Sequence, residues 1–175
     1  MLHDSSDDEP IEGSTIYRAF DRMFGNQDGF PLVVGARTTP VTDSHPSAVH
    51  IFQLWQIYIE TINPLLKITH IPTVQAQILK AAAELESAPQ NIEALMFAIY
   101  LIAITSMDEL EVQTVFNRPK DELLAQYFRA AQQALINAGF LRTNDFTCLQ
   151  AYTLYLVYVL LVLYLSSKLT VCSML

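Results

Sequence analysis

The stretch from residue 91 to residue 106 constrains the fold more than any other part of the sequence. Apolar side chains occupy most of its positions, so a helix built from it is apolar around nearly its whole circumference. Such a helix has to be covered on all sides, which places it at the centre of a bundle. With 16 residues it is short for a membrane span, which needs about 20.

Apolar residues at intervals of three, four and seven predict further helices on both sides of this stretch. They begin near Ser44, Pro72, Ser106, Lys120 and Phe146. The sequence has no alternation of strands with helices and no evenly spaced short strands. The predicted fold class is therefore all-α, an irregular multi-helix bundle of about six helices.

Three local signals predict where helices begin. Ser44 with Pro46 reads as a capping residue with a proline just inside the first turn. Ser106 with Glu109 three positions later fits a capping box. Residues 143–145 offer capping side chains for the final helix.

Two further signals predict where helices end. Pro64 disfavours helical geometry at Asn63, so the first helix should end or kink there. Gly139 lies where a helix C-terminal glycine is expected. The apolar faces of these helices predict a common core: Leu54, Trp55, Tyr58, Met96, Phe97, Tyr100, Tyr127, Phe128 and Leu135.

Charge is distributed unevenly along the 175 residues, which carry a net charge of −8. Residues 1–43 are acidic and rich in loop-forming residues, and we expect them to be a largely disordered segment. Charged residues make up only 16% of the chain, against about 25% in typical proteins. An acidic chain of this kind is not itself suited to wrap nucleic acid, whose phosphates require a basic surface.

The sequence contains no recognisable catalytic or metal-binding motif. Neither a glycine-rich phosphate loop nor a serine nucleophile elbow is present. His3, His45, His50 and His70 lack compact ligand spacing, and Cys148 and Cys172 are too few for a cysteine-rich zinc site. Asp108, Glu109 and Glu111 are typical of a helix start. We therefore expect no enzyme, and no catalytic, cofactor-binding, metal or DNA-binding residue.

The end of the chain allows two interpretations. Residues 146–167 carry no formal charge, and residues 154–165 are an unbroken apolar run. The stretch can be a core helix of the bundle, or residues 151–167 can anchor a helical protein in a membrane by its tail. A span needs about 20 mostly apolar residues, so the length does not decide between the two.

Several short segments, in order, resemble the fungal-specific transcription factor domain, the middle homology region of fungal zinc-cluster regulators of the xylanolytic-activator type. The resemblance covers residues 44–158. The segments are His45–Ser47, Phe52–Tyr58, Asn63–Lys67, His70–Gln75, Asn91–Tyr100, Leu123–Tyr127, Ala131–Ile136, Leu141–Asp145 and Leu149–Ala151.

The resemblance implies an all-helical, non-catalytic regulatory region that controls DNA-templated transcription in the nucleus. In that family a six-cysteine zinc cluster, followed by a basic segment, binds DNA. This chain contains neither, so zinc and DNA binding are expected of the family's N-terminal module and not of this chain. The expected partners are co-regulators, a small effector or a second copy, with DNA reached only through the missing module or through a partner that has it.

The family's domain continues with further helices beyond the point where the resemblance ends. Residues 159–175 form an apolar tail that diverges from it, so we expect a truncated or misread gene product. Exposed apolar helices in such a partial bundle predict a chain that aggregates or forms oligomers, because one exposed large apolar side chain forgoes about 1.5–3 kcal/mol.

Overall fold

A computed structural model describes residues 38–172. This part of the chain is helical and contains no strand, which confirms the all-α prediction. The six predicted helices are all present: α2 (Ala48–Ile57), α4 (Ile71–Ala83), α5 (Gln90–Ser106), α6 (Glu109–Phe116), α7 (Lys120–Asn137) and α8 (Phe146–Cys172). Short elements join them: η1 (Thr42–Ser44), η2 (Tyr58–Ile62), α3 (Asn63–Leu66) and η3 (Leu85–Ser87).

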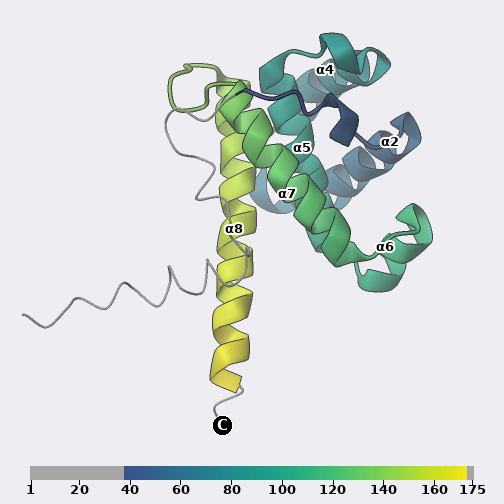
Figure 1. The fold of residues 1–175 in the computed structure, drawn as a ribbon, viewed down its shortest axis with the longest axis vertical. Coiled ribbons are helices and arrows are strands. Elements are labelled where there is room, and N and C mark those ends of the chain that lie inside the picture. Colours follow the sequence, from purple (N-terminus) through teal and green to yellow (C-terminus); the bar gives the residue numbers. More distant parts are fainter. Residues whose placement is uncertain (1–37, 173–175) are drawn as a thin grey trace, which may run out of the picture. The chain divides into compact units, whose positions relative to one another are not determined.

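Helix α5 lies at the centre of the bundle, as its composition predicts. Every residue from Ile92 to Ile104 is buried. Helix α7 runs alongside it, and α2 and α4 also pack against it (Figure 1). A helix without a polar face can exist in water only with neighbours on all sides. The packing thus covers α5 on all sides, as the sequence predicts.

The predicted core residues are all buried. Several of their aromatic rings pack on one another: Tyr100 packs against Phe97 and Tyr127 with ring centroids 5.6 Å apart in each pair. Phe128 stacks on Tyr155 of α8, again at 5.6 Å. The buried members are Leu54, Trp55, Tyr58, Met96, Phe97, Tyr100, Tyr127, Phe128 and Leu135.

The start of α2 differs from the prediction. Ser44 ends the 3₁₀ turn η1 and does not cap the helix. Ser47 does, because its hydroxyl accepts from the backbone N–H of His50 at 3.4 Å. Both serines have the right chemistry for a cap. Pro46 lies between them, ahead of the helix and not in its first turn.

Pro64 acts upstream of its own position. The regular α-helix ends at Ile57, and the chain continues through a π-helical turn, in which the N–H of Asn63 donates to Tyr58 O. Proline has no N–H, and its ring crowds the carbonyl four residues earlier, here that of Glu60. A turn with wider hydrogen bonds accommodates both effects. The predicted end or kink is therefore a π-helical turn followed by α3.

Both ends of the segment between α7 and α8 follow the predicted signals. Gly139 has φ +63°, the left-handed conformation that favours glycine, and the N–H of Phe140 donates to Leu135 O at 3.2 Å. Asp145 caps α8, since its Oδ1 accepts from the N–H of Cys148 at 2.9 Å. This bond is the main cause of the lowered pKa of Asp145.

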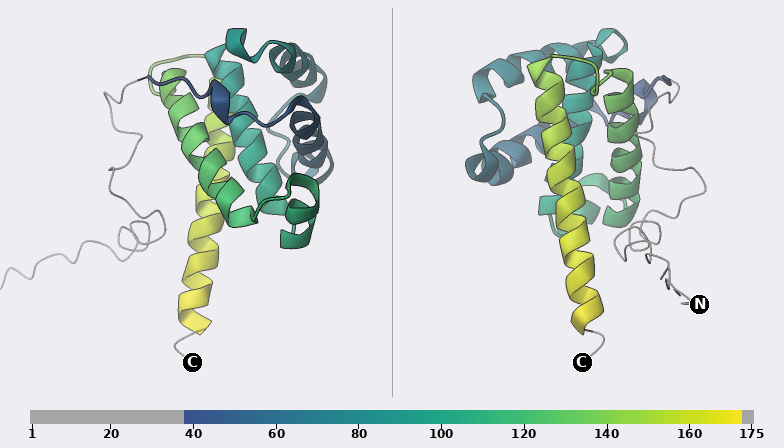
Figure 2. Two further views of the ribbon diagram at one scale, coloured as in Figure 1. Left: turned by 45° about the vertical axis from the view of Figure 1, so that its right-hand side comes forward. Right: turned by 90° about the vertical axis from the view of Figure 1, so that its left-hand side faces the viewer.

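Residues 38–161 belong to one compact unit, and residues 162–172, the last turns of α8, fall outside it. Within that unit α8 buries one stripe: Cys148, Ala151, Leu154, Tyr155 and Tyr158. Figure 2 shows α8 from two further directions. Residues 146–164 are long and apolar enough to cross a membrane, and 33% of their most apolar window is buried. Core helices of soluble proteins share both properties, so this observation alone does not identify a span.

Candidate functional site

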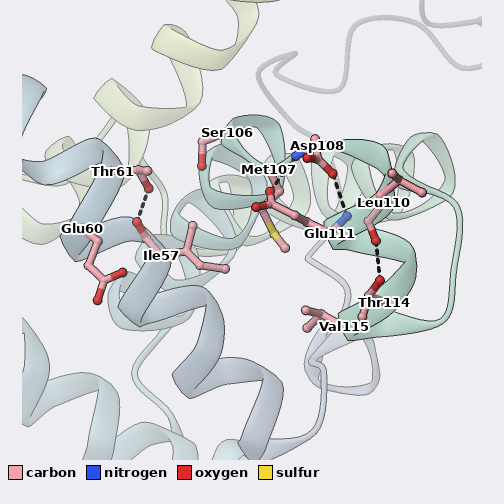
Figure 3. Close-up of a pocket in the computed structure, with 10 residues that line it drawn as sticks. All are labelled: Ile57, Glu60, Thr61, Ser106, Met107, Asp108, Leu110, Glu111, Thr114 and Val115. Atoms are coloured by element: carbon pink, nitrogen blue, oxygen red, sulfur yellow. Dashed lines mark hydrogen bonds between the residues drawn. The ribbon is translucent and has the colours of Figure 1, made fainter.

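A pocket of about 600 Å³ lies between the π-helical turn η2 and helix α6 (Figure 3). Apolar and acidic side chains line it, and no basic side chain does. The lining residues are Ile57, Glu60, Thr61, Ser106, Met107, Asp108, Leu110, Glu111, Thr114 and Val115. The chain segments that form it are about 50 residues apart in sequence, and the bundle brings them together.

A capping box at the start of α6 builds one wall of this pocket. Asp108 Oδ1 accepts from the N–H of Glu111 at 2.7 Å, and Glu111 Oε2 accepts from the N–H of Asp108 at 2.9 Å. The predicted box began two residues too early, at Ser106. That residue is instead the last of α5, and its hydroxyl donates to Ala103 O at 2.8 Å. Asp108 takes the role because its backbone is extended, as a cap requires.

The polar groups of the pocket are engaged in local structure. Thr61 donates to the carbonyl of Ile57, and Thr114 donates to that of Leu110. Glu60 accepts from Gln56 Nε2 at 2.6 Å. Between residues 38 and 172 there is no group of three or more His, Cys, Asp and Glu side chains that could hold a metal ion. The arrangement suits binding of an amphipathic group and offers no activated nucleophile.

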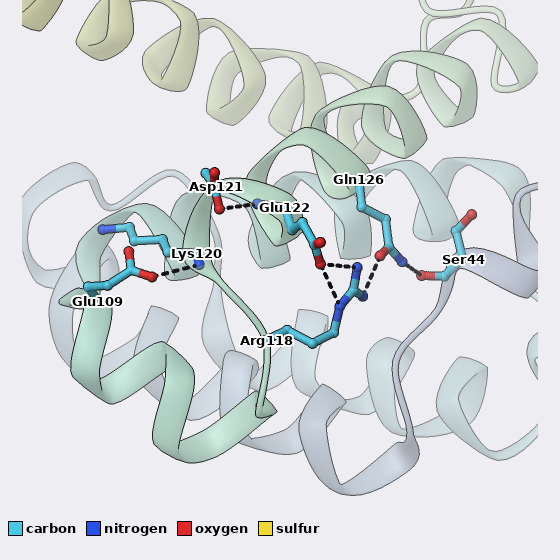
Figure 4. A network of polar contacts seen from close by, with 7 residues as sticks. All are labelled: Ser44, Glu109, Arg118, Lys120, Asp121, Glu122 and Gln126. Atoms are coloured by element: carbon cyan, nitrogen blue, oxygen red, sulfur yellow. Dashed lines mark hydrogen bonds and ion pairs between the residues drawn. The ribbon is translucent and has the colours of Figure 1, made fainter.

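A polar network beside α6 and α7 fastens the segment before α2 (Figure 4). Arg118 donates to Gln126 Oε1 at 2.7 Å and pairs with Glu122 at 3.3 Å, and Gln126 Nε2 donates to Ser44 O at 3.4 Å. The side chains of Arg118 and Glu122 are 44% and 60% exposed. Pairs exposed to this degree contribute about 0–1 kcal/mol each. The network therefore contributes more to the position of the segment before α2 than to the free energy of unfolding.

Lys120 closes the C-terminal end of α5. Its ammonium donates to the carbonyls of Thr105 at 3.2 Å and Met107 at 2.5 Å. The last carbonyls of a helix have no partners within the helix, and a cation there also complements the helix dipole. Its own backbone N–H donates to Glu109 Oε1 at 3.1 Å, so one residue joins α5, α6 and α7.

A buried histidine attaches the segment before α2 to the central helix. The His45 side chain is 1% exposed, and its Nδ1 shares a hydrogen bond with the Tyr100 hydroxyl at 3.2 Å. Its Nε2 lies 3.5 Å from Glu93 Oε1. Burial, followed by the charges of Tyr127 and Glu93, raises the pKa of Tyr100 well above its usual value. These contacts hold the segment before α2 against α5.

The other described histidines and Cys148 also make structural contacts and form no metal-binding group. His50 packs against Phe116 with ring centroids 4.8 Å apart, and His70 Nδ1 bonds Thr73 Oγ1 at 2.8 Å. Cys148 is buried, and burial and the neighbouring Asp145 raise the pKa of its thiol, which makes it less reactive. His3 and the side chain of Cys172 lie outside the described part of the chain.

Two of the buried polar contacts that sequence reasoning missed had a signal in the sequence. One is the His45–Glu93 pair. The other is the bond from Gln132 Nε2 to the Tyr155 hydroxyl at 2.8 Å, which joins α7 to α8. A signal was present in each case, because Glu93 and Gln132 are polar residues on helix faces that are otherwise apolar. A polar residue in such a place needs a partner.

The chain is similar to several fungal transcription regulators. It is 40% identical over 159 residues to the transcriptional regulator AacuB of Aspergillus aculeatus, a match covering 90% of this chain and 21% of the relative. It is 48% identical over 121 residues to the aurofusarin cluster transcription factor aurR2 of Gibberella zeae, covering 69% and 18%. A third relative, at 36% over 139 residues and covering 75% and 18%, is the C6 finger domain transcription factor adaR of Aspergillus niger.

The chain spans about a fifth of the length of the curated relatives it matches. No protein-family model matches the chain, and no solved structure matches it. The relatives give no support to a membrane anchor over residues 151–167. Over most of its length, this chain is therefore similar to one segment of fungal transcription regulators.

Proposed function

We propose that the chain is a non-catalytic regulatory region of a fungal zinc-cluster transcription factor, which controls transcription through contacts made by its helices. One observation carries the proposal: 90% of the chain aligns with the regulator AacuB at 40% identity. An alignment that covers 90% of the chain has to include most of the helices of the bundle. The buried residues of α2, α5 and α7 belong to these helices, which pack against one another.

The geometry agrees with a regulatory role. The bundle has a densely aromatic core and a shallow amphipathic pocket between η2 and α6. Neither feature contains a nucleophile next to a base, which an acyl- or phosphoryl-transfer site would need. The chemistry available on the surface is recognition of another helix or of a small amphipathic molecule.

We propose that DNA and zinc are bound by another segment of the protein or by a partner. The relative adaR carries the name of a C6 finger, and a zinc-binding finger of that kind needs cysteines close together. The sequence has only Cys148 and Cys172. A DNA-binding module on another segment or on a partner would thus select the target sites. This region would act in the nucleus on the level of transcription from those sites.

A fusion reporter tests the proposal. The 175-residue chain is joined to an unrelated DNA-binding domain and expressed in a filamentous fungus with a reporter that carries that domain's site. We expect reporter transcription to differ from that given by the DNA-binding domain alone, and the fusion to be nuclear. Equal transcription from a fusion that is nuclear and folded would refute the role.

Two variants make this experiment specific. Phe97→Ala removes a ring from the centre of the core and should abolish the effect on the reporter together with folding. Leu110→Ala changes a side chain that is 78% exposed and should leave folding intact. It also probes the pocket that Leu110 lines, since a change in reporter output without a change in folding would locate the contact there.

A further inference from the structure

Residues 39–47 form a strap that passes α7 and α5 before the chain enters α2. Figure 2 shows the strap in dark blue. Hydrogen bonds attach it to the two central helices at three places along its length. They join Thr39 to Asn137, Ser44 to Gln126, and His45 to Tyr100. The first two partners belong to α7 and the third to α5, so the strap spans both helices.

Helix α7 holds the strap by its main chain. The side-chain amide of Asn137 bonds both backbone groups of Thr39: its Oδ1 accepts from the N–H at 3.3 Å, and its Nδ2 donates to the carbonyl at 2.7 Å. Gln126 Nε2 donates to Ser44 O at 3.4 Å (Figure 4). The two Asn137 bonds are exposed, so water can replace either partner when they break.

The strap buries little apolar surface. Val41, at 6% exposure, is the only buried apolar residue within it, and Thr39, Pro40 and Asp43 are exposed. Helix α5, by contrast, is buried at every residue from Ile92 to Ile104. A segment with few buried apolar contacts and exposed hydrogen bonds opens at a lower free energy than the core on which it lies.

His45 makes the deepest contact of the strap, and this contact is incomplete. Its ring packs on Phe97 with centroids 4.3 Å apart, and its Nδ1 shares a hydrogen bond with the Tyr100 hydroxyl at 3.2 Å. Its Nε2 is buried and makes no hydrogen bond, although Glu93 Oε1 lies 3.5 Å away. Water would bond this nitrogen in an open strap, so the closed position carries a cost that opening removes.

We propose that the strap opens and closes as a unit while the rest of the bundle stays folded, and that His45 is the side chain that holds it closed. The closed strap covers the rings of Phe97 and Tyr100. Opening uncovers both rings beside the Glu93 carboxylate and detaches the strap from α7. The strap thus controls access to this part of α5. The proposal does not depend on the role in transcription, and the two can fail separately.

Thiol labelling of the full chain tests the strap. Val41→Cys places a probe on it, and the natural Cys148, which is 1% exposed, reports opening of the core. The rate of alkylation by iodoacetamide is measured for each thiol by mass spectrometry and divided by its rate in urea, which cancels differences in reactivity. We expect the normalised rate at position 41 to exceed that of Cys148 by more than about tenfold.

Two further variants, each added to the probe variant, identify the contacts that keep the strap closed. His45→Ala and Asn137→Ala should raise the normalised rate at position 41 by more than about threefold and leave that of Cys148 unchanged, because both residues bond across the edge of the strap. The matched control His70→Ala changes an exposed histidine outside the strap and should alter neither rate.

Two results would overturn the proposal. Equal normalised rates at position 41 and at Cys148 would mean that the strap opens only when the whole bundle unfolds. An Asn137→Ala variant that raises both rates alike would mean that this residue supports the bundle and not the strap. Circular dichroism accompanies each variant. If His45→Ala does not fold, His45→Gln replaces it, with the same expectation.

Discussion

At the scale of single residues, the bundle is held by a few polar side chains that reach across elements. Lys120, Gln132 and His45 each bond to a different helix or segment from their own. Each is placed where apolar packing leaves a carbonyl or a hydroxyl that needs a partner. Their contribution is measurable because removal of one partner leaves the other unsatisfied.

Replacement of Lys120 by methionine should destabilise the bundle. The change keeps the length of the side chain but leaves the carbonyls of Thr105 and Met107 without the ammonium. We expect the free energy of unfolding to fall by about 1.5–3 kcal/mol. Urea denaturation measures it, with Lys80→Met on α4 as the control, since that lysine is exposed. An equal loss in both variants would contradict the role given to Lys120.

The hydroxyl of Tyr155 gives a second test at this scale. Tyr155→Phe leaves the amide of Gln132 buried without an acceptor, so the free energy of unfolding should fall by about 1–3 kcal/mol. Tyr152→Phe, three residues earlier on the same helix, is the control, because its side chain is only half-buried. Thermal unfolding distinguishes the two. A Tyr155→Phe variant as stable as the natural chain would show that the bond contributes nothing.

At the scale of elements, helix starts are set by the residue whose backbone is extended, not by the first residue with suitable chemistry. Ser44 and Ser106 both looked like caps, and the caps are Ser47 and Asp108. The sequence offers several capping residues within one turn, and the tertiary packing decides among them. For the same reason the π-helical turn at Tyr58–Ile62 was not predicted beyond a kink at Pro64.

The corrected start of α6 is testable by two alanine substitutions. Asp108→Ala removes the side-chain acceptor of the capping box, to which the N–H of Glu111 donates, and should cost about 0.5–2 kcal/mol. Ser106→Ala removes only a bond to the carbonyl of Ala103 within α5 and should cost less than about 0.5 kcal/mol. Chemical denaturation gives both values. The reverse order would restore Ser106 as the cap.

At the scale of the whole molecule, the sequence predicted the helices and the core but not the site. Apolar periodicity is local, so α5 and the nine core residues followed directly from it. The pocket between η2 and α6 depends on which segments meet in space, and no local pattern carries that information. The function came from the resemblance, and the comparisons agree with it through relatives that are named as transcription regulators.

Alkaline pH should unfold the bundle over a defined range. Burial raises the pKa values of Tyr58, Tyr100, Tyr127, Tyr155 and Tyr158, and those of Tyr127 and Tyr155 from 10.0 to about 12. A pKa raised by folding stabilises the folded state below the unfolded value, and this contribution is lost as pH rises through the folded value. The tyrosine contribution to stability should be constant below pH 10 and fall towards about pH 12.

Helicity and tyrosinate absorbance, followed together in an alkaline titration, measure this loss. Ionisation of the buried tyrosines should coincide with the loss of helix. Complete ionisation near pH 10 with the helices intact would show that these side chains are accessible to water.

The central claim is that this bundle does the work of the corresponding segment in a fungal transcription regulator. An exchange experiment tests it most directly: the 159 residues of AacuB that align with this chain are replaced by its own, and transcripts under AacuB control are measured in Aspergillus aculeatus. The account predicts that the hybrid sustains transcription and that Phe97→Ala within it does not. A hybrid that is stable and nuclear but leaves those transcripts at the level of an AacuB deletion would contradict it.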